Sequence, residues 1–117
     1  MDDSQQYTPV ISQTLAQLND SSAAMDKIMA DNSDNLDIYR AADTQKGAIE
    51  DRISTLENLQ LAQDSNEMQA LMPDLQQAKA NLDGVLAKIS KASDIVDGVA
   101  KFLVVVDVLA KAAKAVV

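Results

Sequence analysis

An apolar residue recurs at every third or fourth position over the last 50 residues of the chain, and no other pattern in the sequence limits its folding as strongly. This spacing is a heptad seam, which places one face of an α-helix against a neighbouring helix. The seam residues are Met68, Leu71, Leu75, Ala78, Leu82, Val85, Ile89, Ala92, Val96, Val99, Leu103, Val106, Ala110, Ala113 and Val117. The seam predicts a long C-terminal helix with coiled-coil-like packing.

The same region can form one helix or two. A turn has no reason to keep the register of a seam, so the unbroken repeat favours a continuous or kinked helix, roughly 75 Å long at 1.5 Å per residue. The capping-box spacing of "DSNE" at 64–67 predicts where it starts. A break at Gly98 is the alternative, giving a helix at about 65–96 and an apolar helix at 99–117. A chain of this length more naturally holds four shorter helices.

Two further helices are predicted before the seam. The first spans about 8–31, because Pro9 is tolerated in a first helical turn and apolar residues follow at helical spacing. The stretch "DNSDNLD" at 31–37 is rich in N-cap residues, so a second helix is expected at about 35–63. The predicted apolar faces are Ile11, Leu15, Leu18, Met25 and Met29 in the first helix, and Ile38, Ala42, Ile49, Leu56 and Leu59 in the second.

The composition favours an all-helical fold. Helix-forming residues dominate, the chain has three glycines, and no Asn-Gly or Asp-Gly hairpin signal separates alternating apolar runs. A length of 117 residues suits one domain with one core. We therefore expect residues 1–117 to form a single all-α domain, an antiparallel helical bundle of three to four helices with a long C-terminal heptad helix.

The sequence offers little for catalysis or cofactor binding. It contains no cysteine and no histidine, which removes thiolate and imidazole chemistry and the usual zinc or haem ligands. The acidic stretch at 31–37 does not match a calcium loop, because Leu36 and Ala42 stand where an EF-hand needs glycine and glutamate. A P-loop and a dinucleotide fingerprint are both missing. We predict a non-enzymatic protein with no cofactor and no metal.

Charge is distributed unevenly along the chain. Residues 1–74 hold fourteen Asp or Glu and four Lys or Arg, whereas residues 75–117 hold four and six. The total net charge of −8 thus comes from −10 on the first part and +2 on the last. Nucleic-acid binding is excluded as a main function, because it depends on Lys and Arg and the chain also lacks an aromatic stacking surface.

The C-terminal helix is apolar over most of its circumference. A transmembrane helix needs about 20 mostly apolar residues, and four charged side chains interrupt this one. A helix this apolar must be buried, yet the first two predicted helices cannot cover all of it. The sequence therefore predicts an interaction surface here. Its residues are Ile95, Val99, Phe102, Leu103, Val105, Val106, Leu109, Ala113 and Val116.

Two functions fit such a surface, and a third follows from the uneven charge. The favoured one is a structural or interaction protein that forms a homo-oligomer, or docks with another helical protein, through the C-terminal helix. The second is an amphipathic protein that associates with a membrane or another hydrophobic surface, such as a toxin component or a lipid or granule binder, with Lys101, Lys111 and Lys114 at the interface. The third is an acidic inhibitor or immunity-type protein whose first 74 residues face a basic target.

In length and helical-hairpin layout the chain is similar to small helical proteins of bacterial specialised secretion systems, although it lacks the Trp-x-Gly turn of the best-known group. The similarity implies a subunit of a secretion-type or filamentous assembly, and no residue roles are carried over. The opening "MDDSQQYTPV" is acidic and polar, whereas a secretory signal is basic and then apolar. We expect cytoplasmic localisation, with leaderless secretion as the alternative.

Overall fold

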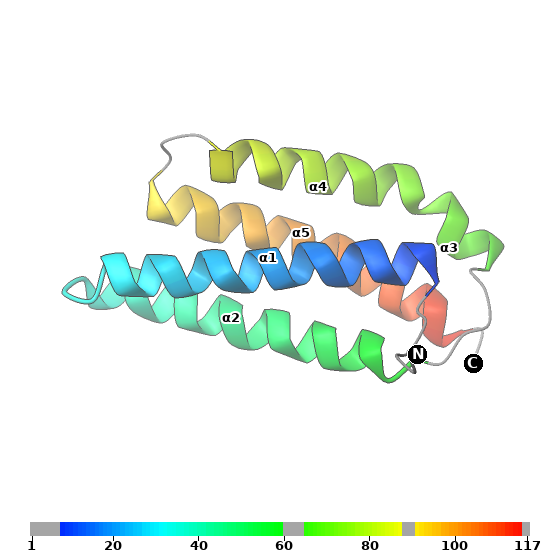
Figure 1. The fold of residues 1–117 in the computed structure, drawn as a ribbon, viewed down its shortest axis with the longest axis horizontal. Helices are drawn as coiled ribbons and strands as arrows, with labels where there is room; N and C mark the ends of the chain where they lie inside the picture. The colour runs from blue at the N-terminus through cyan, green and yellow to red at the C-terminus, as the bar shows by residue number, and fades with distance from the viewer. Residues whose placement is uncertain (1–7, 60–64, 88–90, 116–117) are drawn as a thin grey trace, which may run out of the picture.

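The computed structural model describes residues 8–59, 65–87 and 91–115, and this part of the chain is helical and without strands. Five helices pack together, which confirms the all-α class (Figure 1). They are α1 (Pro9–Asp31), α2 (Leu36–Glu57), α3 (Asn66–Ala70), α4 (Met72–Ala87) and α5 (Ala92–Lys114). The long helices follow the longest axis of a molecule that measures 46 × 28 × 25 Å.

Side-chain caps mark the starts of the first two helices. Thr8 Oγ1 accepts a hydrogen bond from the Ile11 amide at 3.4 Å, and Pro9 follows at the first helical position, where no amide donor is needed. Asn35 Oδ1 accepts one from the Ile38 amide, also at 3.4 Å, and starts α2. The chain turns back between these helices, so α2 lies along α1 (Figure 1).

The next helix starts at a cap and is interrupted almost at once. Ser65 Oγ accepts a hydrogen bond from the Met68 amide at 3.1 Å and begins α3. A short break at Leu71 separates α3 from α4. Pro73 accounts for it, because proline lacks a backbone N–H and its ring crowds the carbonyl four residues earlier, that of Gln69.

The long continuous C-terminal helix predicted from the seam is wrong. Helix α4 ends at Ala87, and Lys91 has an extended conformation with φ −65° and ψ 147° before α5 begins. The alternative break at Gly98 is also wrong, since α5 runs through that residue. Residues 88–90 lie outside the described part of the chain. Helix α5 instead folds back along α4, and the two are in contact over much of their length (Figure 1).

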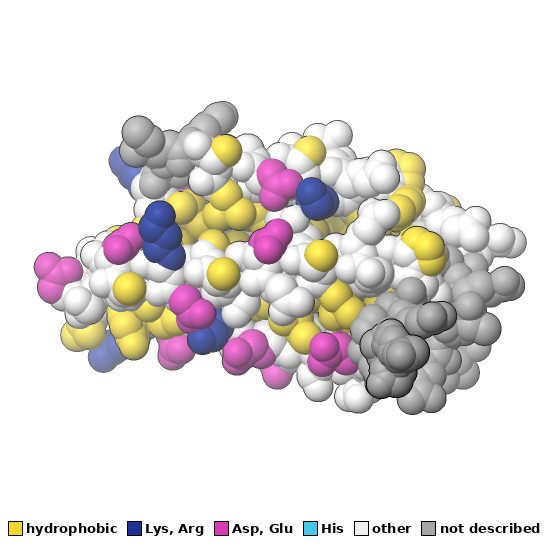
Figure 2. Space-filling model, viewed as in Figure 1, with side chains coloured by type: hydrophobic (Ala, Val, Ile, Leu, Met, Phe, Trp, Pro, Cys, Tyr) yellow, Lys and Arg dark blue, Asp and Glu magenta, His cyan; other side chains and the backbone are white. Residues whose placement is uncertain are grey.

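Both halves of the seam face the same core. The buried seam residues are Met68, Leu75 and Leu82 before the break, and Val96, Val99, Leu103, Val106, Ala110 and Ala113 after it. Helix α1 packs against α2, α2 against α5, and α5 against α4, whereas α1 and α4 touch at few points. Figure 2 shows hydrophobic side chains at the surface in the furrow between α1 and α4.

Candidate functional site

The predicted interaction surface lies mostly inside the single chain. Ile95 and Val105 are half-buried, and Val116 lies outside the described residues. The buried members are Val99, Phe102, Leu103, Val106, Leu109 and Ala113, each at most 4% exposed. The apolar pattern does not reveal the reversal before α5. This reversal brings α4 over a side of α5 that the first two helices leave uncovered. The chain therefore buries for itself most of the surface that was assigned to a partner.

A smaller apolar pair on α5 remains in solvent. Val104 is 63% exposed and Val108 is 48% exposed, and they lie one helical turn apart on the outer face of α5. The exposed large apolar residues elsewhere in the described chain are Leu36, at 58%, and Tyr39, at 39%, near the start of α2. Val104 and Val108 are not among the residues of the predicted interaction surface.

These two valines form part of a groove between α4 and α5, which we call the α4/α5 groove. Its volume is about 700 Å³. Its lining includes the buried side chains of Leu82 and Phe102 together with the half-buried Val85 and Val105. Gly98 also lines it, and a Cβ atom there would lie 3.4 Å from Leu82 Cδ1. A small residue at 98 thus allows α5 to approach α4 closely beneath the groove.

Charged side chains line the same groove. Asp74 lies in the first turn of α4, and Asp94 lies in the first turn of α5, with Asp97 one turn further along. Lys101 is the cation among the described residues that line the groove. All four side chains are exposed. The groove therefore combines an apolar floor with an excess of negative charge.

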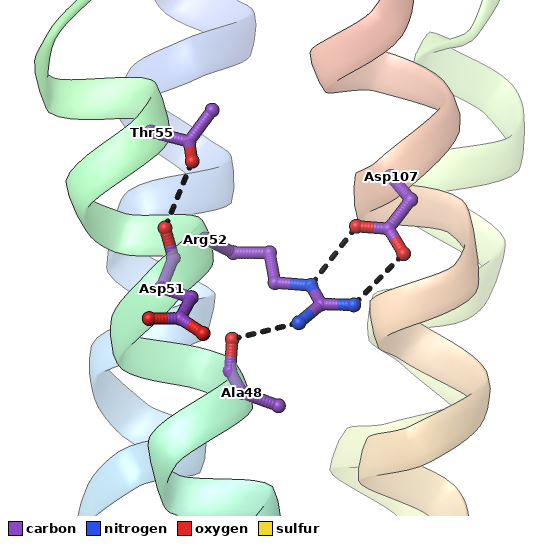
Figure 3. A network of polar contacts seen from close by, with 5 residues as sticks. All are labelled: Ala48, Asp51, Arg52, Thr55 and Asp107. Carbon is purple, nitrogen blue, oxygen red and sulfur yellow. Dashed lines mark hydrogen bonds and ion pairs between the residues drawn. The ribbon is translucent and has the colours of Figure 1, made fainter.

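A polar network joins α2 to α5 on another side of the molecule (Figure 3). Arg52 Nε and Nη2 donate to the two carboxylate oxygens of Asp107, each at 2.9 Å, and Arg52 Nη1 donates to the Ala48 carbonyl at 3.1 Å. Asp107 precedes Lys111 by four residues on α5, a spacing that suits an ion pair within one helix, but its carboxylate binds Arg52 of α2 instead. The pair is partly exposed, so it contributes at most about 1 kcal/mol.

Helix α1 buries polar side chains that were not assigned from the sequence, and one of them is bonded to α4. Gln17 is 1% exposed, its Nε2 donates to Asp83 Oδ1 at 3.1 Å, and its Oε1 is buried without a hydrogen-bond partner. Thr14 and Ser21 are buried as well, and each hydroxyl donates to the backbone carbonyl four residues earlier. Thr14, Gln17 and Ser21 are spaced by three and four residues, a helical spacing that could have indicated a second buried face of α1.

A second groove of about 750 Å³ lies near the end of α1 that precedes the turn. Ala24 and Ile28 line it from α1, and Ile95 lines it from α5. Leu86 and Ala92 also contribute, and these two residues flank the undescribed residues 88–90.

The described residues contain no cluster of acidic side chains that could hold a metal ion. Within the same ranges, no helix is both long enough and apolar enough to cross a membrane.

Lys46 Nζ donates to Asp26 Oδ1 at 2.6 Å between α2 and α1, and this hydrogen bond and the charge of Asp26 raise the pKa of Lys46 above its usual value. The Lys46–Asp26 and Arg52–Asp107 pairs tie helices together on the surface. Comparison of the chain with protein-family models, curated proteins and solved structures found no match.

Proposed function

We propose that this chain is a non-enzymatic helical interaction protein that binds a protein partner through the exposed face of α5 and the α4/α5 groove. The observation that carries the proposal is the exposure of Val104 and Val108 beside an apolar groove. Full burial of a valine side chain is worth roughly 1.5–3 kcal/mol, so a partner that covers both gains from their burial. We also propose an antiparallel bundle with coiled-coil-like packing as the scaffold for this surface.

Self-association and docking with another protein are the two forms of this function. Either form covers Val104 and Val108, and either is compatible with a subunit of a larger assembly, secreted or cytoplasmic. The membrane alternative has weaker support, because one of the three lysines expected at the interface, Lys101, lines the α4/α5 groove. Lys111 and Lys114 line a different groove, beside Arg52 of α2. The exposed Asp94 and Asp97 near the valines also oppose contact with anionic lipid.

The test is to replace the exposed valines with a neutral helix former. Val104→Gln with Val108→Gln removes the apolar pair, and Leu36→Gln with Tyr39→Gln removes a pair of similar exposure on α2 as the matched control. The full chain and both double variants are tagged in the cells that produce them, and the proteins that co-purify are quantified. We expect at least one protein, or untagged copies of the chain, to be lost with the α5 variant and kept with the α2 variant.

The result is decisive only if both variants fold. Circular dichroism on the purified chains should show wild-type helicity for each, since all four positions are exposed. Equal recovery of every co-purifying protein with the wild type and the α5 variant would show that the α5 face is not a docking surface.

A further inference from the structure

We propose that the α4/α5 groove binds an amphipathic helix of a different protein, and that lysine or arginine residues flank the apolar stripe of this helix. The inference rests on the proposed function and adds the chemical nature of the partner. It excludes a second copy of the chain as the occupant of the groove.

The apolar part of the groove favours a helix as the occupant. Two helices that lie side by side leave a furrow into which a third amphipathic helix can place its apolar face. The floor of this furrow is apolar, with Leu82 and Phe102 buried and Val105 half-buried. Val104 and Val108 are four residues apart, so they match an apolar stripe that repeats every three or four residues on the partner.

The charges of the groove favour cationic residues on the flanks of that helix. Asp74 lies near the start of α4, and Asp94 and Asp97 lie near the start of α5. Because α4 and α5 run in opposite directions (Figure 1), carboxylates lie at both ends of the groove. Lys101 alone opposes them among the described lining residues. A partner helix with cationic residues at its ends and along its flanks complements this pattern and is attracted to it before contact.

The same charges disfavour a second copy of the chain. A two-fold dimer places the same surface patch of each copy in one interface. Because carboxylates lie at both ends of the groove, Asp94 and Asp97 of one copy would then lie near Asp74 or near the corresponding residues of the other copy, at distances where salt screens poorly. Each chain also carries a net charge of −8, which adds repulsion between whole molecules. Binding of a separate, basic partner does not involve this repulsion.

The experiment uses two synthetic amphipathic peptides of about 18 residues, each roughly 27 Å long as a helix. They share one leucine stripe and differ only in their flanking residues, which are lysine in the first peptide and glutamate in the second. Fluorescence anisotropy measures the binding of each peptide to the full-length chain. We expect the lysine peptide to bind about tenfold or more tightly than the glutamate peptide, with a preference that shrinks as salt is raised to about 0.5 M.

Three variants show whether the binding occurs in the groove. Asp94→Asn with Asp97→Asn should weaken the lysine peptide about fivefold. The matched control, Asp37→Asn with Asp43→Asn, removes two exposed carboxylates from α2 and should weaken it less than about twofold. Val104→Gln with Val108→Gln leaves the net charge unchanged and should weaken the lysine peptide about tenfold.

Failure of this inference can be separated from failure of the proposed function. Equal affinity for the two peptides, or equal weakening by the α5 and α2 charge variants, overturns the basic partner. If the valine variant still lost binding in that case, the docking surface itself would stand. Sedimentation that shows a dimer of the wild type and a monomer of the valine variant overturns the inference in favour of a second copy. Capture by phosphatidylcholine vesicles that depends on the valines overturns it in favour of a lipid surface.

Discussion

Helices α1 and α5 are each 23 residues long and each bury nine side chains, but they bury different chemistry. All nine buried side chains of α5 are apolar. Three of the nine on α1 are polar, namely Thr14, Gln17 and Ser21. Helix α5 also leaves Val104 and Val108 in solvent, whereas α1 exposes no large apolar side chain among its residues.

The apolar content of a helix and the burial of its faces are thus separate properties. Thr14 and Ser21 can be buried at little cost because their hydroxyl groups bond to the backbone of their own helix. Helix α5 has contacts on two sides, from α2 and α4, and still carries more apolar residues than these contacts cover. The apolar residues left over on α5 indicate the surface where a partner is needed.

The largest expected effect comes from charging the inner face of α5. Phe102→Asp with Leu109→Asp puts two carboxylates at positions that are 2% and 0% exposed, so the variant should lose more than about 4 kcal/mol and unfold. Circular dichroism should show the loss of helicity. Retained helicity with a smaller particle size by light scattering would show that Phe102 and Leu109 lie between molecules, and the contrast between α1 and α5 would no longer hold.

A smaller change is expected at the polar face of α1. Gln17→Leu removes the buried Oε1 that has no partner and adds apolar contact, at the loss of one hydrogen bond to Asp83. The free energy of unfolding should rise by about 1 kcal/mol, measured by urea denaturation. Gln13→Leu, at an exposed position of the same helix, is the control and should change it by less than about 0.5 kcal/mol. A Gln17→Leu variant less stable than the wild type would show that the hydrogen bond outweighs the unpaired oxygen.

The smallest effect is expected at the outer face of α5. Val104→Gln with Val108→Gln should leave the free energy of unfolding within about 0.5 kcal/mol of the wild type, because both side chains are already exposed. Thermal melting of the monomer checks this expectation. A loss of several degrees would mean that the valines contribute to the stability of the bundle itself, and the contrast between the two faces of α5 would disappear.

The helical class and much of the core could be predicted, because seam residues such as Leu75, Leu82 and Val99 are buried at helical spacing. The reversal before α5 could not. Val85 and Ala92 are seven residues apart, so the seam passes over the break without a phase change. The N-cap Lys91 makes no side-chain cap hydrogen bond, whereas Thr8, Asn35 and Ser65 cap their helices through side chains. The reversal before α5 thus lacked the two signals that would have marked it in the sequence, a phase change in the seam and a side-chain N-cap.

This reversal also accounts for the burial of residues that the sequence assigned to a partner. Without α4 folded over α5, Phe102 and Leu109 had no cover within the chain, and they were assigned to a partner. Val104 and Val108 could be recognised from their place on the outer face of the helix. Their role in a groove depends on the neighbouring α4, and the spacing of residues along one helix cannot reveal it.

The arrangement of neighbours has a consequence for how the chain folds. Helix α1 contacts α2, and α4 contacts α5, so each pair joins segments that are close in sequence. The contact between α2 and α5 is the main one that spans a long stretch of chain. Low average sequence separation favours folding in microseconds to milliseconds. We expect two helical hairpins to form early and the α2–α5 contact to unite them last, so mutations in that contact should slow folding less than they speed unfolding.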